Sequence, residues 1–153
     1  MKKAVIILAA GLLCLSLQAH AKDGVIYKTA SGLNFINGGI SEEETATIRQ
    51  NAKNFSLQVL FSGGAVGGWL TDVSMMILDG NGKTVFWKKS SGPMLYIDLP
   101  AGDYQVIGRY NGERQSKRFT LTGEKPQRVI LNWKEELADF EPMIKGEEDA
   151  PVN

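Results

Sequence analysis

The sequence predicts an all-β fold, an antiparallel β-sandwich of about seven strands with one short N-terminal surface helix. Three observations support this prediction. From Phe55 to Trp133, apolar residues recur with a period of two, as they do in half-buried strands. Turn sequences interrupt the pattern about every 8–12 residues, a spacing typical of sandwiches. No helix-length segment separates the strands, which argues against a parallel α/β sheet.

The turns between the expected strands are rich in Gly, Asn and Asp. Residues 79–82 (Asp-Gly-Asn-Gly) and 111–112 (Asn-Gly) are typical of hairpins, because these residues tolerate a positive φ. The glycine-rich stretch 63–68 is interpreted as a flexible connector, since it lacks the Gly-Lys-Ser/Thr ending of a phosphate-binding loop. The expected strands cover residues 57–61, 70–78, 83–88, 94–99, 104–110, 114–121 and 128–133.

A single convincing helix is predicted over residues 42–54, within a lead-in where one or two short strands are also expected. Ser41 is the expected N-cap, and Glu44 is expected to reach back to the N-cap amide in a capping box. The apolar positions of this helix form one narrow stripe, which indicates a surface helix: Ile48, Ala52 and Phe55.

Residues 1–21 have the features of a secretory signal peptide. Two lysines and an apolar run precede Ala19 and Ala21, the small residues that signal peptidase reads. The alternatives are a membrane anchor, for which a run of about 14 residues is too short, and a lipoprotein. Lipidation of Cys14 would need small residues before it, and two leucines stand there. We therefore expect cleavage after Ala21 and a periplasmic location, with secretion as the alternative.

Cleavage would remove Cys14 and His20, the only cysteine and the only histidine of the chain. Disulfides, Cys/His zinc sites, cysteine nucleophiles and serine–histidine triads would then be excluded. Loss of two lysines leaves 15 of the 17 basic residues against 17 acidic ones, a net charge of −2. No concentrated basic stretch points to nucleic acid.

The segment after Trp133 is strongly acidic, with Lys145 as its only basic residue beyond Lys134. We expect a disordered, solvated tail over residues 135–153, with binding of a basic partner as the alternative. The expected organisation is therefore a signal peptide, a lead-in, a sandwich domain and a tail, over residues 1–21, 22–54, 55–134 and 135–153.

One sequence motif resembles a known family. Residues 99–106 (Leu-Pro-Ala-Gly-Asp-Tyr-Gln-Val), followed by Tyr-Asn-Gly at 110–112, resemble the L-P-x-G-x-Y-x-V signature of carboxypeptidase regulatory-like domains. These are small sandwiches related in fold to transthyretin. Residues 73–85 look like the hairpin that precedes this signature, so the resemblance covers about residues 55–133. Together with the Gly-Gly-Ile and glutamate-rich lead-in, the layout resembles a subgroup of proteobacterial periplasmic proteins.

The resemblance implies an accessory, adhesive or binding module rather than a catalyst, and fold alone does not fix function. Trp69 and Trp87 border polar or glycine-rich segments and are the aromatic residues expected to be exposed for ligand binding. Arg109 and Lys117, in the basic hairpin 109–118, are expected to face solvent on neighbouring strands, opposite the face of Tyr104 and Val106. The alternative interpretations are that the aromatic residues are buried in the core and that the basic hairpin is only a solvated strand face.

The sequence therefore predicts a non-enzymatic exported module that binds an envelope protein or polymer. It predicts no catalytic residue, no metal, no cofactor, no nucleic acid and no membrane span after cleavage. The alternatives are a small-ligand or carbohydrate-binding module that uses exposed aromatics, and a hydrolase that uses carboxylates only, such as Asp72 and Asp98.

Overall fold

The computed structural model describes residues 25–134, so the predicted signal peptide and acidic tail lie outside the described residues. The all-β prediction is confirmed, because strands dominate this range and one α-helix accompanies them. The elements in chain order are β1 (Tyr27–Lys28), β2 (Asn34–Gly38), α1 (Glu42–Gln50), the 3₁₀ helix η1 (Ala52–Asn54), β3 (Leu57–Gly63), β4 (Gly68–Trp69), β5 (Val73–Asp79), β6 (Thr84–Ser91), β7 (Met94–Ile97), β8 (Gly102–Tyr110), β9 (Glu113–Leu121) and β10 (Gln127–Trp133).

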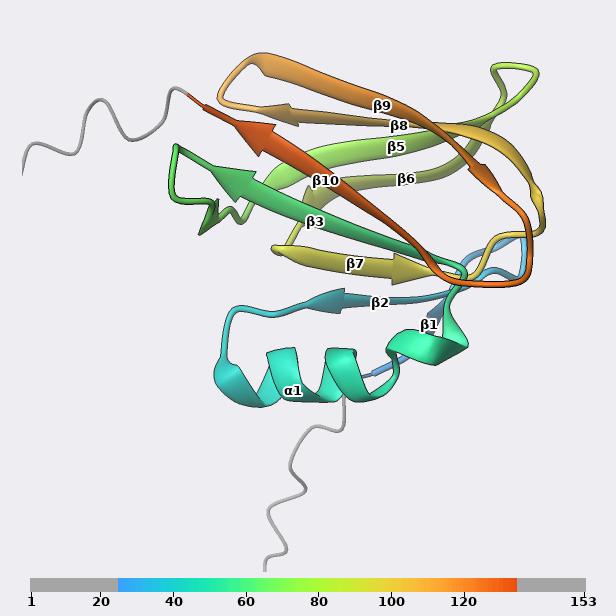
Figure 1. Cartoon of the computed structure of the whole chain (residues 1–153), viewed down its shortest axis with the longest axis horizontal. Helices are drawn as coiled ribbons and strands as arrows, with labels where there is room; N and C mark the ends of the chain where they lie inside the picture. The colour runs from blue at the N-terminus through green and yellow to red at the C-terminus, as the bar shows by residue number, and fades with distance from the viewer. Residues whose placement is uncertain (1–24, 135–153) are drawn as a thin grey trace, which may run out of the picture.

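The strands form two sheets, stacked as layers with α1 on the far side of one of them (Figure 1). The six-stranded sheet has the order β1-β2-β7-β3-β10, and β4 pairs with β3. The four-stranded sheet has the order β6-β5-β8-β9. Every described pair is antiparallel except β3 and β10, which run parallel. The lead-in thus contributes β2 to the same sheet as β3 and β7.

The main hydrophobic core lies between the two sheets. Each sheet directs alternate side chains into it, as the period of two requires. On β3 these are Leu57, Val59 and Phe61, and on β5 they include Val73 and Ile77; all five are inaccessible to solvent. The remaining buried members, from β5, the other strands and their flanks, are Met75, Phe86, Leu95, Ile97, Leu99, Tyr104, Val106, Leu121, Val129, Leu131 and Trp133.

A second, smaller core lies between α1 and the outer face of the six-stranded sheet. Ile48 of α1 is 1% exposed and packs in one cluster with Met94 and Tyr96 of β7. The surface helix predicted from its narrow stripe therefore covers one face of the sheet. Leu60 of β3, which points away from the main core, belongs to the same cluster and is 8% exposed.

The ends of α1 differ in two details from the prediction. The α-helix stops at Gln50 instead of continuing to residue 54, because the side chain of Asn51 donates to the carbonyl of Thr47 and ends the helical ladder. At the other end, the Ser41 hydroxyl accepts from the Glu44 amide at 3.1 Å, as predicted. The Glu44 carboxylate, however, accepts from the two preceding amides, those of residues 39 and 40, at 3.2 and 3.1 Å.

The hairpin turns have the expected chemistry. The Asp79 carboxylate accepts from the amides of Asn81 and Lys83, both at 2.9 Å, which fixes the β5–β6 turn. Asn111 and Gly112 both have positive φ, as a two-residue β8–β9 turn demands. In the stretch 63–68, β3 ends at Gly63 and β4 begins at Gly68, so the connector forms the turn of a short hairpin.

Candidate functional site

The outer face of the four-stranded sheet is the candidate binding face. Since Val106 points into the core, its neighbours on β8 point the other way, and the pairing register carries this alternation across the sheet. In Figure 1 this face lies on the side of the molecule away from α1. Among the described elements, none packs on it, since α1 contacts the six-stranded sheet instead.

An apolar row crosses the middle of this face. Met76 of β5 pairs with Trp87 of β6 on one side and with Ile107 of β8 on the other. The indole of Trp87 is 60% exposed. Ile107 is only 9% exposed although it belongs to neither core cluster, so the side chains around it on the face cover it. A flat apolar strip that ends in an exposed tryptophan is the result.

Three arginines flank the apolar row. Arg109 pairs directly with Arg114 across β8 and β9, and Arg118 pairs with Gln105 four residues further along. Like charges in directly opposed positions are destabilising by several tenths of a kcal/mol. Within residues 25–134, no carboxylate forms an ion pair with these three guanidinium groups. The face therefore presents concentrated positive charge that the described residues do not neutralise.

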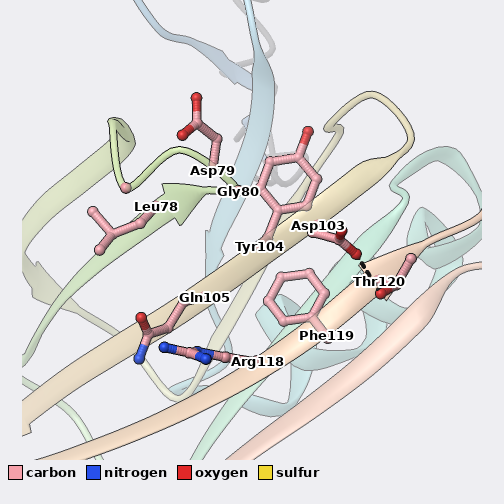
Figure 2. Close-up of a pocket in the computed structure, with 10 residues that line it drawn as sticks. Leu78, Asp79, Gly80, Asp103, Tyr104, Gln105, Arg118, Phe119 and Thr120 are labelled. Atoms are coloured by element: carbon pink, nitrogen blue, oxygen red, sulfur yellow. Dashed lines mark hydrogen bonds between the residues drawn. The ribbon is translucent and has the colours of Figure 1, made fainter.

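A depression of about 530 Å³ lies at the end of the sheet near the β5–β6 turn. Figure 2 shows Gln105 and Arg118 side by side at one end of it, and the hydrogen bond at the other end that joins the Thr120 hydroxyl to the Asp103 carboxylate at 2.6 Å. Its lining residues are Leu78, Asp79, Gly80, Gly82, Asp103, Tyr104, Gln105, Arg118, Phe119 and Thr120. The polar groups at its rim can accept from or donate to a bound hydroxyl or carboxylate.

The stack of Tyr104 on Phe119, with ring centroids 5.8 Å apart, supports this end of the sheet. The Tyr104 hydroxyl donates to the carbonyl of Pro100 at 2.9 Å, which ties the strand to the preceding turn. Burial raises the pKa of Tyr104 above its ordinary value of 10.0, and the negative charge of Asp79 raises it further. The phenol therefore stays neutral around neutral pH.

The structure places two of the four predicted binding residues on the candidate face and the other two on different surfaces. Trp87 and Arg109 lie on the candidate face. Trp69 is 52% exposed as expected, but it pairs with Ser62 and so lies on the outer face of the other sheet. Lys117 pairs with Val106 and therefore leaves the sheet on the side opposite to Arg109. The expectation that Arg109 and Lys117 share a face is wrong.

The reason lies in the turn between β8 and β9. Because this turn contains only two residues, Tyr110 opposes Glu113, and the partner of every later residue follows. Counting pairs from the turn places Arg114 directly opposite Arg109 and Arg118 further along the same face, whereas Lys117 lies on the other face. The apolar residues Met76 and Ile107 are harder to identify from sequence, because alternation alone does not say which face of a strand meets the second sheet.

The acidic side chains and the helices of residues 25–134 bear on metal binding and on membrane insertion. No group of three or more His, Cys, Asp or Glu side chains in that range is placed to hold a metal ion. No helix in it has the length and apolarity needed to cross a membrane. Two of the carboxylates have structural partners, since Asp103 accepts from Thr120 and Asp72 accepts from Ser90 at 2.7 Å.

Comparison with known proteins gives no family for this chain. No family model matches the sequence, and no curated protein matches it either.

Proposed function

We propose that this protein is a non-enzymatic, exported module that binds a partner in the bacterial envelope through the outer face of its four-stranded sheet. The partner is an envelope protein or polymer that carries anionic groups. The observation that carries the proposal is the exposed side chain of Trp87 next to Met76, with the Arg109–Arg114 pair on the same face.

The chemistry of this face favours an anionic partner. A guanidinium group can donate two parallel hydrogen bonds to one carboxylate or phosphate. Two adjacent guanidinium groups repel each other until such an anion lies between them, so binding relieves a cost that the free protein carries. The exposed indole of Trp87 adds a flat apolar surface for a sugar ring or an aliphatic side chain.

Carbohydrate binding through exposed aromatics is the second candidate, and one observation favours it. Trp87 is 60% exposed and pairs with Met76 on the candidate face, where a sugar ring could stack on it. Trp69 lies on the other sheet, so a ligand that covers Trp87 does not touch it. A neutral polysaccharide would then bind through Trp87 without help from the arginines.

For the fold, we propose membership in the carboxypeptidase regulatory-like, transthyretin-related sandwiches. The hydrogen bond from Tyr104 to the carbonyl of Pro100 supports it, because the tyrosine and the proline of the L-P-x-G-x-Y motif then act together to hold a strand to its turn. This bond resembles the tyrosine corner of immunoglobulin-like sandwiches. Export rests on the sequence of residues 1–21, and it implies that the protein isolated from the periplasm begins at Lys22.

Binding to three defined polymers tests the proposal: a sulfated polysaccharide, polyglutamate and neutral dextran. We expect binding to one or both anionic polymers, and at least about a tenfold loss of affinity for Arg109→Gln/Arg114→Gln at low ionic strength. Lys117→Gln/Lys125→Gln is the charge-matched control, because it removes two positive charges outside this face, one from the opposite side of the same hairpin and one from the loop before β10. Equal losses for both variants would show that net charge, not this face, attracts the polymer.

The same assay separates the two candidates. Trp87→Ala should weaken binding to every polymer that uses the face, whereas Trp69→Ala should not. Dextran binding that Trp87→Ala weakens and that Arg109→Gln/Arg114→Gln leaves unchanged would favour the carbohydrate-binding function. Both candidate functions would be rejected if none of the three polymers bound and if a cross-linker placed at position 87 captured no envelope component.

A further inference from the structure

The depression beside the β5–β6 turn has the size of a ligand subsite. Its volume of about 530 Å³ lies within the range of roughly 300–1,000 Å³ that small-molecule sites occupy. It is lined by Leu78, Gln105 and Arg118, which stand in one row across β5, β8 and β9 because the register pairs each with the next. Tyr104 and Val106, on either side of Gln105, belong to the main core, so this row lies on the candidate binding face. The depression is therefore one end of that face.

Polar groups of this depression lack partners among the described residues. Within residues 25–134, the side chains of Gln105 and Arg118 make no hydrogen bond or ion pair, and Figure 2 shows them side by side. Asp103 differs, because one of its carboxylate oxygens accepts from the Thr120 hydroxyl at 2.6 Å. Its other oxygen has no partner in the same range. The depression thus presents a cation, an amide and a carboxylate oxygen that a ligand can satisfy.

The mixture of charges in the depression selects the chemistry of the ligand. The Arg118 guanidinium can donate two parallel hydrogen bonds to one carboxylate. The free oxygen of Asp103 only accepts, so it repels an anion and needs a donor such as a hydroxyl. Leu78 adds an apolar surface on which the carbon face of a sugar ring can pack. A hexuronate, which is a sugar that carries a carboxylate beside its ring hydroxyls, satisfies all three groups.

A second cationic position lies further along the same strands. Arg114, which pairs with Arg109, precedes Arg118 by four residues on β9. At about 3.4 Å per residue, the two positions are roughly 14 Å apart. A single small anion cannot contact both, whereas a chain of linked anionic units that runs along β8 and β9 can. The face is therefore suited to a polymer that repeats its anionic groups along the chain.

We propose that the depression is a subsite for one sugar unit, and that the anionic polymer bound by the candidate binding face is a polysaccharide of hexuronate units. This inference rests on the proposed function, because it names the class of polymer that the face binds. The carboxylate of one unit lies on Arg118, and the hydroxyls of that unit bond to Asp103 and Gln105. Neighbouring units reach Arg114 and Arg109. The arginines attract any polyanion, but only hydroxyls beside the carboxylate satisfy the rest of the depression.

Gly80 leaves room for the sugar at the rim of the depression. A Cβ built on Gly80 would lie 3.6 Å from the Cβ of Asp103, an ordinary contact distance, and the φ of Gly80 lies outside the left-handed region. Alanine is therefore tolerated at this position. A larger side chain would extend from a point already in contact with Asp103, so Gly80→Phe should obstruct the subsite.

Binding of polygalacturonate and polyglutamate, at matched chain length and low ionic strength, tests the subsite. Both polymers carry one carboxylate per unit, but only polygalacturonate carries hydroxyls on the same unit. We expect polygalacturonate to bind at least about tenfold more tightly, since the hydroxyls add hydrogen bonds in the depression. Gln105→Leu changes no charge, and it should reduce the affinity for polygalacturonate about fivefold while polyglutamate binding stays the same.

Two matched controls accompany these variants. Gln127→Leu makes the same exchange at an exposed position of β10, in the other sheet, and should leave both affinities unchanged. Gly80→Phe should weaken polygalacturonate binding about as much as Gln105→Leu, and Gly80→Ala should not weaken it. Circular dichroism checks that Gly80→Phe is folded, and Gln105→Leu carries the test if it is not.

Failure of the subsite and failure of the proposed function give different results. Equal affinities for the two polymers, with neither affinity changed by Gln105→Leu, would overturn the subsite while the binding function stands. If Gln105→Leu weakens polygalacturonate binding and Arg109→Gln/Arg114→Gln does not, the subsite stands and the role proposed for the arginine pair fails. Absence of binding to any anionic polymer would overturn both.

Discussion

The indole of Trp133 occupies the space that a side chain on Gly108 would fill. A Cβ built on Gly108 would lie 2.8 Å from Cη2 of Trp133 and 2.8 Å from Cδ1 of Leu131, closer than real Cβ contacts come. The last strand of the six-stranded sheet thus packs directly against the backbone of β8 in the other sheet. The glycine is required here for space and not for an unusual φ.

Gly108→Ala should therefore destabilise the protein by about 1–3 kcal/mol, because the overpacked methyl forces Trp133 and Leu131 to move. Urea unfolding followed by circular dichroism measures the change. Gly68→Ala is the control, since the nearest atom to a Cβ there is the carbonyl oxygen of Gly63 at 3.8 Å. Equal destabilisation by both substitutions would contradict the packing argument.

Tyr104→Phe should cost about 0.5–1.5 kcal/mol of unfolding free energy, because the hydroxyl donates to the carbonyl of Pro100. The aromatic stack on Phe119 is retained, so the fold should persist. Thermal and urea unfolding give the difference. Tyr27→Phe, at a half-exposed tyrosine, should change stability by less than about 0.5 kcal/mol.

Stability should fall at alkaline pH, and Tyr104 should account for part of the loss. Burial and the charge of Asp79 raise its pKa in the folded protein, so folding favours the neutral phenol. This contribution is fully present below the unfolded pKa of about 10 and is lost as the pH rises through the higher folded value. Unfolding free energies measured from pH 8 to 11.5 should decline less steeply in Tyr104→Phe. An unchanged slope would contradict the assignment.

Glu44→Gln should destabilise the protein by about 1 kcal/mol, since its carboxylate accepts from two backbone amides ahead of α1. The loosened contact should also expose Ile48, the residue with which α1 enters the second core. Hydrogen exchange of the α1 amides measures both effects. Glu43→Gln removes the same charge from the same helical turn, and its effect should be clearly smaller.

The all-β class was predictable because alternation is a local property of the sequence, and the expected strands over residues 70–78 and 104–110 overlap most of β5 and β8. The cover over the outer face of β3 was not predictable, because that face carries the polar residues Gln58 and Ser62 beside Leu60. Gln58 is 7% exposed, and its side chain donates to the carbonyl of Ala52. A buried polar residue with a satisfied hydrogen bond has the same appearance in sequence as a solvent-facing one.

The candidate site was predictable in part. The exposure of Trp87 followed from its polar neighbours, and the presence of basic residues around Arg109 followed from composition. The error at Lys117 came from register, which a two-residue turn fixes and which inverts the face of every residue when shifted by one. Proximity of the end of β10 to the β8–β9 turn depends on a contact 20 residues apart in sequence, between Trp133 and Glu113, that no local pattern reveals.

The parallel pairing of β10 with β3 has a consequence for the order in which this chain can fold. Val129 aligns with Val59 and Leu131 with Phe61, so the edge of the six-stranded sheet closes only when residues 70 positions apart meet. Such non-local pairing slows folding, because the intervening chain loses conformational entropy before the contact between the two strands contributes any stability. A nascent chain that lacks β10 would also leave Phe61 and Gly108 without the cover of Trp133. Late closure of this kind would suit the exported protein proposed above, which must cross a membrane before it folds.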